Sequence, residues 1–332
     1  MEFIVNNKKV LEQIQAPSLN GSGKVSTAKP FIEANTIPVS VKEIRDEHII
    51  PVWATSNEPL ISHSEFVEST WEMTHRMFAN ETIMKPSIRV SHPIKGRIPE
   101  AKKKAAKDLQ PHEQTLYYER MMFVIEIPSV YDTVNGNSLS LTIGGVKSYN
   151  LDNLYSKRGS ADQHFQLFVG FQNTVCCNLC VWSDGIAEEV GISSTGQLMY
   201  AVENLINRYK AGKHLKAMRN MIDIELSETE FAQVVGRCRM FKHLPDATRK
   251  GIPEILLGDQ QLSAVVHDYY KDFNFGTEQG GSISMWQFYN LLTGANKSSY
   301  IDSFLERGVN SHDFSYGLIN HKINKDPFWY MG

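Results

Sequence analysis

The residues whose types and spacing could support chemistry lie mainly between Tyr149 and Gly185, where a polar loop precedes an apolar segment and three cysteines. Asp152 and His164 could serve as acid and base beside a thiol of the Cys176–Cys180 cluster, which would be nucleophilic catalysis. No nucleophile-elbow motif surrounds any serine, and no glycine-rich phosphate loop is present. An enzyme built on these groups is therefore an alternative hypothesis, and we assign no catalytic residue.

Cys177 and Cys180 form a C-x-x-C pair, which is half of a typical zinc site or a redox-active dithiol. Tetrahedral zinc needs two further ligands at matching spacing, and the sequence offers only Cys238 with His243. Every second residue from 175 to 181 is apolar or a cysteine (Val175, Cys177, Leu179 and Val181), as in a buried strand where a thiol packs as a small apolar group. The sequence therefore predicts buried, reduced thiols, with no metal and no cofactor.

The tyrosines Tyr149 and Tyr155 lie close in sequence to Lys147, Lys157 and Arg158, a mixture suited to stacking bases while neutralising phosphates. Contact with single-stranded or duplex DNA is the function that this pattern favours. The predicted contact surface consists of Lys147, Tyr149, Asn150, Asp152, Asn153, Tyr155, Lys157, Arg158, Arg237 and Arg239. The alternative is that the tyrosines pack against the edge of a sheet.

Two other lysine-rich runs, at 95–107 and 208–219, could add to such a surface. Lysines at helical spacing usually form only a solvated face, so we leave both runs out of the predicted site. The whole chain carries a formal net charge of −3, so any site for a polyanion must be a local patch.

The composition, 42% hydrophobic and 21% charged in 332 residues, is that of an ordinary globular protein with two domains or one large one. No stretch approaches the roughly 20 apolar residues that span a bilayer. The N-terminus lacks the basic start and apolar run of a signal peptide. We therefore expect a cytoplasmic protein without a membrane partner.

The elements that must position these residues read as an α+β fold, with a mainly antiparallel sheet in the first half and middle and a helical C-terminal half. Asn135-Gly136 between the β-rich runs Met121–Val130 and Leu139–Val146 predicts a hairpin. Alternating polar and apolar residues in the second run predict one buried and one open face. A second strand pair is expected at Phe165–Phe171 and Val175–Trp182.

Capping boxes at Ser62/Glu65 and Ser227/Glu230 each predict the start of a helix. Further helices are expected to begin near Ser193, Asp259, Ser284 and Ser298. The segment Thr36–Trp53 contains two prolines and predicts an extended segment or an edge strand. We divide the chain into a flexible N-terminal arm (1–30), an α+β sheet domain (31–190) and a helical domain packed on it (191–332).

The amino-acid sequences of several segments resemble those of a bacterial family, domain of unknown function 3871, of Bacteroides-type genomes. The segments are GGVKSYNLDNLYSK, FQLFVGFQNTVCCNLCVWSDG, GRCRMFKHLP and LLTGANKSSYIDSFLERGVN. The stretch from Asn150 to Leu179 is also distantly similar to the phage/plasmid-like protein family. That similarity implies a setting on plasmids, prophages or conjugative elements, and it carries no catalytic residue.

The leading hypothesis is an accessory protein of a mobile element that binds nucleic acid without catalysis, as a single-strand binder or annealer that could form a homo-oligomer. One alternative is a protein-interaction module acting in phage/host conflict, with the aromatic residues of 284–310 as its contact surface. The other is the enzyme built on Asp152, His164 and the cysteine cluster.

Overall fold

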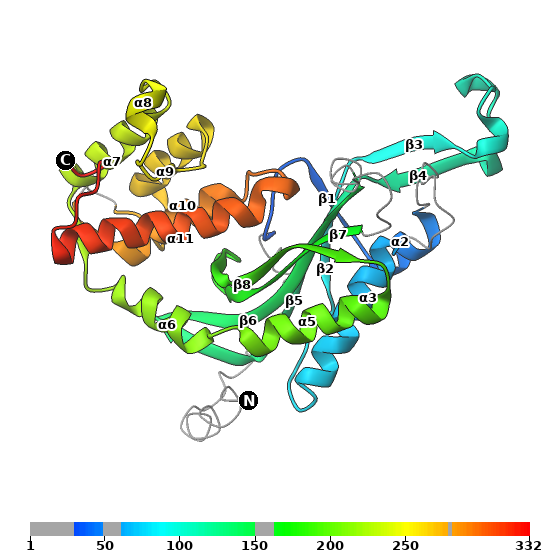
Figure 1. Cartoon of the computed structure of the whole chain (residues 1–332), viewed down its shortest axis with the longest axis horizontal. Coiled ribbons are helices and arrows are strands. Elements are labelled where there is room, and N and C mark those ends of the chain that lie inside the picture. Colours follow the sequence, from blue (N-terminus) through cyan, green and yellow to red (C-terminus); the bar gives the residue numbers. More distant parts are fainter. Residues whose placement is uncertain (1–29, 49–60, 150–162, 278–280) are drawn as a thin grey trace.

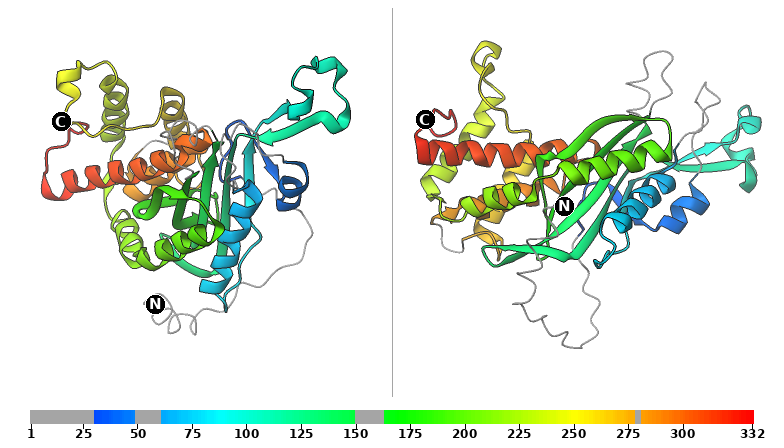
Figure 2. Two further views of the ribbon diagram at one scale, coloured as in Figure 1. Left: turned by 45° about the vertical axis from the view of Figure 1, so that its right-hand side comes forward. Right: turned by 60° about the horizontal axis from the view of Figure 1, so that its bottom comes forward.

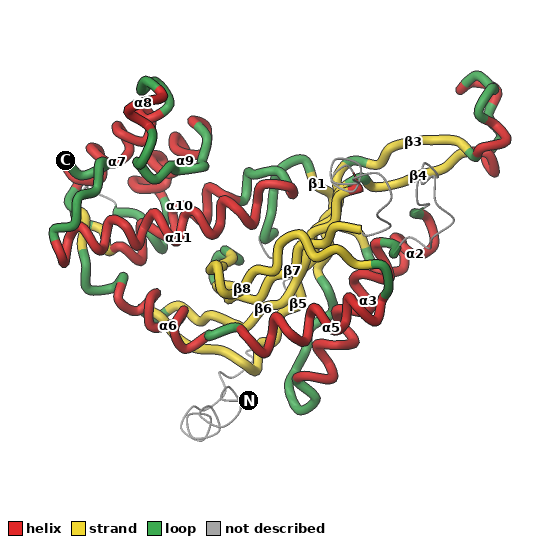
Figure 3. The backbone as a smooth tube through the Cα atoms, in the orientation of Figure 1, coloured by secondary structure: helices red, strands yellow, loops and turns green. Residues whose placement is uncertain are grey.

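The computed structural model describes residues 30–48, 61–149, 163–277 and 281–332 (Figure 1). Most strands lie in one part of the molecule and most helices in another (Figure 3). The predicted α+β class is confirmed, with antiparallel strands in the first half and middle of the chain and helices toward its C-terminus. The predicted N-terminal arm lies, except for Pro30, outside the described residues.

A six-stranded antiparallel sheet forms the centre of the fold, in the order β1-β2-β5-β6-β7-β8. Its strands are β1 (Thr36–Val39), β2 (Ser87–Ser91), β5 (Arg120–Val134), β6 (Asn137–Ser148), β7 (Gln163–Asn173) and β8 (Leu179–Ile192). Pro38 lies in β1 at the edge of this sheet, where a residue without an N–H disturbs no ladder. The edge strand expected at the start of Thr36–Trp53 is therefore confirmed.

Asn135 and Gly136 connect β5 to β6 as a two-residue turn, and both have positive φ, 47° and 75°. Turns of this kind match the right-handed twist of the strands they join, which is why Asn-Gly favours them. The predicted hairpin is confirmed. Its ladder runs from Arg120↔Ser148 to Val134↔Asn137, with a bulge between Ile127 and Tyr131.

Helices cover both faces of the sheet (Figures 1 and 2). The helices α3 (His63–Met77) and α5 (Thr195–Arg208) lie on one face, and α11 (Ile301–Asn324) lies on the other. On the first face Phe66 meets Phe123 and Phe165 edge to face, with ring centres 5.0 and 4.7 Å apart. On the second, Phe304 belongs to a separate apolar cluster with Met122.

The prediction of one open face for Leu139–Val146 is wrong. Ser140 and Thr142 are as fully buried as the leucines beside them. Each hydroxyl donates to a nearby oxygen, Ser140 to the Glu126 carboxylate at 2.6 Å, so burial leaves neither without a partner. The period-2 pattern reported the chemistry of the two faces correctly, but helices cover the more polar face as well.

The predicted helix starts at Ser62 and Ser227 are confirmed as capping boxes of α3 and α7 (Glu228–Phe241). Ser284 caps α10 (Met285–Asn296) in the same way with Gln287. The helix α9 (Asp259–Lys271) begins at Asp259 as expected, with Gly258 as its N-cap, and α11 begins at Ile301, three residues after Ser298.

Two local expectations are wrong. Val41–Glu47 is a helix, α2, with a capping box at Ser40 and Glu43, although we expected this part of Thr36–Trp53 to be extended. The turn between β7 and β8 occupies 174–178 rather than 172–174, and Cys177 lies in it with φ 57°. Val175 is correspondingly 51% exposed instead of lying in a strand.

The remaining helices form the end of the molecule opposite β3 and β4 (Figure 1). They include α6 (Ala211–Asn220), α8 (Asp246–Arg249), α7, α9 and α10, with a small sheet of β9 (Glu225–Leu226) and β10 (Ile283–Ser284). The domain boundary drawn at 190/191 falls inside β8. One apolar cluster joins residues of the sheet, such as Phe171, to residues of the helices, such as Tyr289.

Residues 93–118 leave the sheet as a projecting two-stranded hairpin, which we call the basic hairpin (Figure 2). Its strands are β3 (Pro93–Arg97) and β4 (Gln114–Tyr118), and short 3-10 turns form its tip. No helix in the described ranges is long and apolar enough to cross a membrane.

Candidate functional site

The predicted contact residues Lys147 and Tyr149 lie at the end of β6 and are buried, with 0% and 4% of their surfaces exposed. Neither side chain offers a surface to a nucleic-acid strand in this conformation. The predicted residues Asn150, Asp152, Asn153, Tyr155, Lys157 and Arg158 lie outside the described residues.

Arg237 and Arg239 lie on α7, at the opposite end of the molecule from the basic hairpin (Figure 1). Arg237 is half-buried, donates to the carbonyl of Trp329 and lies 5.3 Å from the centre of its ring. Arg239 is exposed and donates to Oγ of Ser263 at 2.5 Å. The structure therefore does not bring these two arginines together with Lys147.

The alternative enzyme site is spread along β7 and β8. His164 pairs with Gly191, whereas Cys180 pairs with Phe171. His164 and Phe171 are seven residues apart on one strand, about 23 Å at roughly 3.3 Å per residue. A base and a nucleophile must lie within hydrogen-bond reach, so His164 and Cys180 cannot act as a catalytic pair in this fold.

The thiols are packed rather than reactive. Cys176, Cys180 and Cys238 are buried, as predicted, and burial raises their pKa to about 11, 12 and 12. Cys177 is half-buried in the turn before β8, so the strand position that we expected for it is wrong. In the part of the chain that the structure describes, no three His, Cys, Asp or Glu side chains gather closely enough to hold a metal ion.

The aromatic residues of 284–310, which the interaction hypothesis used as a contact surface, are mostly core. Trp286, Phe288, Tyr289 and Phe304 are buried, and Tyr300 alone of the residues discussed there is well exposed, at 61%. Polar Asn290 instead faces the β7–β8 turn, where its carbonyl accepts from the Asn178 amide at 3.0 Å. These residues join the helices to the sheet.

A polar cluster surrounds Lys147 at the end of the sheet beside the basic hairpin. Lys147 Nζ donates to Oε1 of Gln163 at 3.1 Å and lies 4.0 Å from the centre of the Phe165 ring. The same Gln163 oxygen accepts from the backbone N–H of Ile61. His63 stacks on His48 with ring centres 4.7 Å apart. Sequence spacing could not reveal this cluster, because its members, which include Tyr118, come from five separate segments.

The backbone of one residue, Tyr118, fixes the tautomers of both histidines. The Tyr118 N–H donates to Nδ1 of His48 at 3.0 Å, so that nitrogen carries no proton. His48 then carries its proton on Nε2, which lies 3.2 Å from the hydroxyl oxygen of Tyr149. His63 donates from Nε2 to the Tyr118 carbonyl at 2.8 Å. His48 is therefore held neutral, and both rings have defined orientations.

The surroundings of the two histidines favour the neutral form. Burial lowers the pKa of His48 to about 4. Burial, with a smaller contribution from the charge of Lys147, holds the pKa of His63 well below its usual value, despite the hydrogen bond to Tyr118. Nδ1 of His63 is buried and has no hydrogen-bond partner among the residues described here. The arrangement orients the backbone of Tyr118 and the two rings.

The basic hairpin carries a cluster of exposed positive charge on a projection. It contains six lysines and arginines against three acidic residues, a net charge of +3 in a chain of net charge −3. Lys104 pairs with Glu113. No ion pair engages the other lysines, Lys95, Lys102, Lys103 and Lys107, within the described ranges, and all four are exposed. The lysine run at 95–107, which the sequence did not distinguish from a solvated face, is thus displayed on a projection.

A family model described as "Domain of unknown function, B. Theta Gene description" matches residues 16–331. No curated protein and no solved structure matches the chain. The family match thus covers nearly the whole sequence, including the basic hairpin and the polar cluster, and its description names no reaction and no ligand.

Proposed function

The chain belongs to this family, domain of unknown function 3871, and from that starting point we propose that it binds nucleic acid through the basic hairpin. The observation that carries the proposal is the cluster of exposed lysines at the tip of a hairpin that projects from the body (Figures 1 and 2). Phosphate contacts from Lys and Arg supply most of the affinity of sequence-independent nucleic-acid binding.

The shape of the hairpin supports this function over a merely solvated face. A charged face of a helix lies flat on the body, whereas residues 98–113 stand away from it and can be approached from several sides. A two-stranded ribbon is also narrow enough to enter the major groove of a duplex. Both single strands and duplexes are therefore ligands to test.

Several basic residues outside the hairpin lie in ion pairs. Arg219 pairs with Asp132, Lys322 with Glu230 and Lys242 with Asp259. Such pairs reduce the net positive field around each residue. Within the described ranges no ion pair reduces the positive field of Lys102, Lys103 and Lys107. The same holds for Lys210, Lys213 and Lys216 of the second run, so the projecting position of the hairpin is what favours it. A role in nucleic-acid handling would also suit an accessory protein of a plasmid, prophage or conjugative element.

The direct test is a charge reversal at the tip, Lys102→Glu with Lys103→Glu and Lys107→Glu, assayed by fluorescence anisotropy with single-stranded and duplex DNA over a salt series. Each lost phosphate contact should lower the slope of log K against log salt by about 0.7 to 0.9. We expect the triple variant to bind at least about tenfold more weakly at low salt, with a smaller slope.

The matched control reverses three exposed lysines of the second run, Lys210→Glu, Lys213→Glu and Lys216→Glu, at or near α6. The change in net charge is the same, so a general field effect would weaken both variants equally. Equal loss in the two triples, or no binding by the unmodified protein at low salt, would refute the proposal. Competition by polyaspartate as strong as that by DNA would reduce it to non-specific cation exchange.

A further inference from the structure

We infer that His48 and His63 are positioning residues that fix the direction of the basic hairpin by holding the backbone of Tyr118. The claim that this direction matters for binding rests on the proposed function. The claim that the two histidines hold the hairpin does not, because it follows from hydrogen bonds at the base of the hairpin.

The basic hairpin is the outer part of one long hairpin that begins in the sheet. In the sheet Val90 faces Met121, and in the basic hairpin Pro93 faces Tyr118. The second pair lies three positions further along both strands than the first, so the register is the same before and after the break. The break at His92 and Glu119 is therefore a bend in a continuous ladder and no slip of one strand past the other.

Side chains and a neighbouring strand end occupy the backbone groups at this bend. Oγ of Ser91 accepts from the N–H of Arg120 at 3.2 Å. The carbonyl of Glu119 accepts from the N–H of Tyr149 at 3.1 Å. The N–H and the carbonyl of Tyr118 are taken by His48 and His63. Since a buried backbone group without a partner is costly, these bonds favour one bend over a straight ladder.

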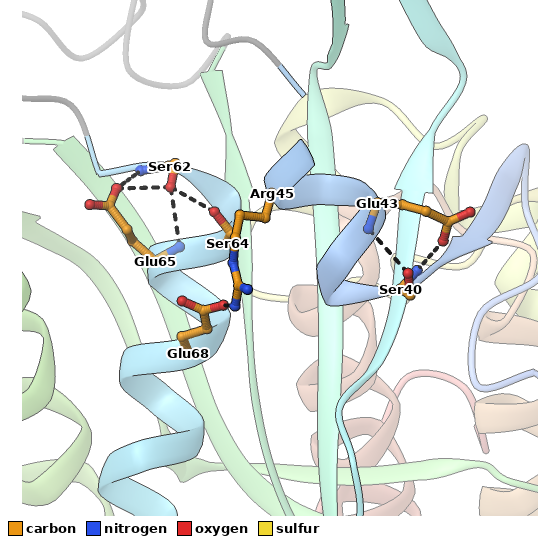
Figure 4. Close-up of polar contacts among 7 residues, drawn as sticks. All are labelled: Ser40, Glu43, Arg45, Ser62, Ser64, Glu65 and Glu68. Carbon is orange, nitrogen blue, oxygen red and sulfur yellow. Dashed lines mark hydrogen bonds and ion pairs between the residues drawn. The ribbon is translucent and has the colours of Figure 1, made fainter. Parts of the chain in front are cut away.

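The two histidines can act as fixed points because their helices are joined to each other. His48 ends α2 as its C-cap and His63 is the first residue of α3. Arg45 of α2 pairs with Glu68 of α3, and a capping box closes the start of each helix, at Ser40 and Ser62 (Figure 4). Tyr118 is thus held from two sides by residues of two helices that contact each other.

The hydrogen bonds specify which substitutions preserve the grip. His48 must accept at Nδ1, and the amide oxygen of asparagine occupies the corresponding position. His63 must donate from Nε2, and the amide nitrogen of glutamine occupies that one. His48→Asn and His63→Gln should therefore keep the bonds to Tyr118, whereas His48→Leu and His63→Leu fill similar space without a donor or acceptor.

The experiment measures hydrogen exchange by mass spectrometry and DNA affinity on the full chain for these four variants. In His48→Leu we expect faster exchange in peptides covering 93–95 and 114–120, unchanged exchange in β6 and β7, and at least about threefold weaker binding with a smaller salt slope. His48→Asn and His63→Gln should stay within about twofold of the unmodified protein.

Unchanged exchange at 114–120 in both leucine variants would overturn the inference, as would equal effects of leucine and amide substitutions. Should His63→Leu fail to fold, His48→Leu, at a half-buried position, decides the matter. Faster exchange without any change in DNA binding would support the claim that the histidines hold Tyr118. It would refute the claim that this contact matters for binding. Absence of DNA binding by the unmodified protein would refute the proposed function. The exchange data would still decide whether His48 and His63 hold the backbone of Tyr118.

Discussion

The ammonium group of Lys147 lies 4.0 Å from the centre of the Phe165 ring, on the sheet face that α3 covers. Lys147 is buried here, although its charge led us to predict that it lies on the exposed surface that contacts nucleic acid. The difference has a direct consequence for mutagenesis, because a buried lysine and an exposed one respond differently to the same substitution.

Replacing Lys147 by methionine should leave DNA affinity within about twofold, because the side chain contacts Gln163 and aromatic rings rather than phosphate. Lys147→Glu should instead lower the thermal stability, since a carboxylate at the same buried site loses both contacts. Anisotropy and a thermal melt measure the two effects. A tenfold loss of affinity in Lys147→Met at unchanged stability would return Lys147 to the binding surface.

The loop residues predicted from sequence can be tested independently of the hairpin. The double variant Lys157→Glu with Arg158→Glu should weaken DNA binding if the loop contributes to the contact surface. Its effect should combine with that of the hairpin triple so that the fold-changes multiply, as expected for separate sites. Anisotropy on the combined variant measures this. No effect of the double variant would confine the contact to the hairpin.

Stability should fall as the pH drops below about 6.5, because His48 is held neutral in the fold with a pKa of about 4. The unfolded chain then binds a proton that the folded chain does not, so acid favours unfolding. At pH 5 this one residue should cost about 2 kcal/mol relative to neutral pH. Urea titrations should show a smaller loss by about that amount in His48→Asn. Equal pH dependence in the two proteins would contradict the assignment.

Gly144→Ala should lower the free energy of unfolding by about 2 kcal/mol or more, because an added Cβ would lie 2.2 Å from the carbonyl oxygen of Phe123. Gly236→Ala in α7 is the matched control. Its Cβ meets nothing within 4 Å, and alanine favours a helix over glycine by about 1 kcal/mol. Urea denaturation should therefore give changes of opposite sign. The same sign in both would show that the sheet relaxes around Gly144.

A thiol reagent should find one fast-reacting cysteine in the folded chain. Cys177 is half-buried, whereas burial raises the pKa of the other three thiols and excludes the reagent. Ellman's reagent at pH 8 should release close to one equivalent quickly and four in concentrated guanidinium chloride. Cys177→Ser should abolish the fast phase. Two or more fast thiols would indicate that the β7–β8 turn opens.

The order and type of most elements could be predicted because local signals agreed with the fold. Asn135-Gly136 and the boxes at Ser62 and Ser227 each fix a conformation within four residues. The helix α2 carried the same signal, Ser40 with Glu43, and the prolines on either side concealed it. Where the local signal was overridden, as in β6, the cause was burial by distant helices.

The polar cluster could not be predicted, because His48, His63, Tyr118, Lys147 and Gln163 share no spacing and meet only through tertiary contacts. The sequence alone does not show whether a lysine close to a tyrosine is exposed or buried. The position of the two residues in the sheet determines it. The lysine run at 95–107 was visible in sequence. What its sequence lacked was any sign that the flanking strands continue a ladder outward.

The shared register on both sides of the bend separates what the hairpin tip carries from what the fold requires. Any segment that joins Arg97 to Gln114 and lets those two residues pair leaves the rest of the ladder in place. The tip can thus be lengthened, shortened or given another charge without rewriting the core. The sequence of the tip and the pairing of the sheet are therefore independent of each other in this fold.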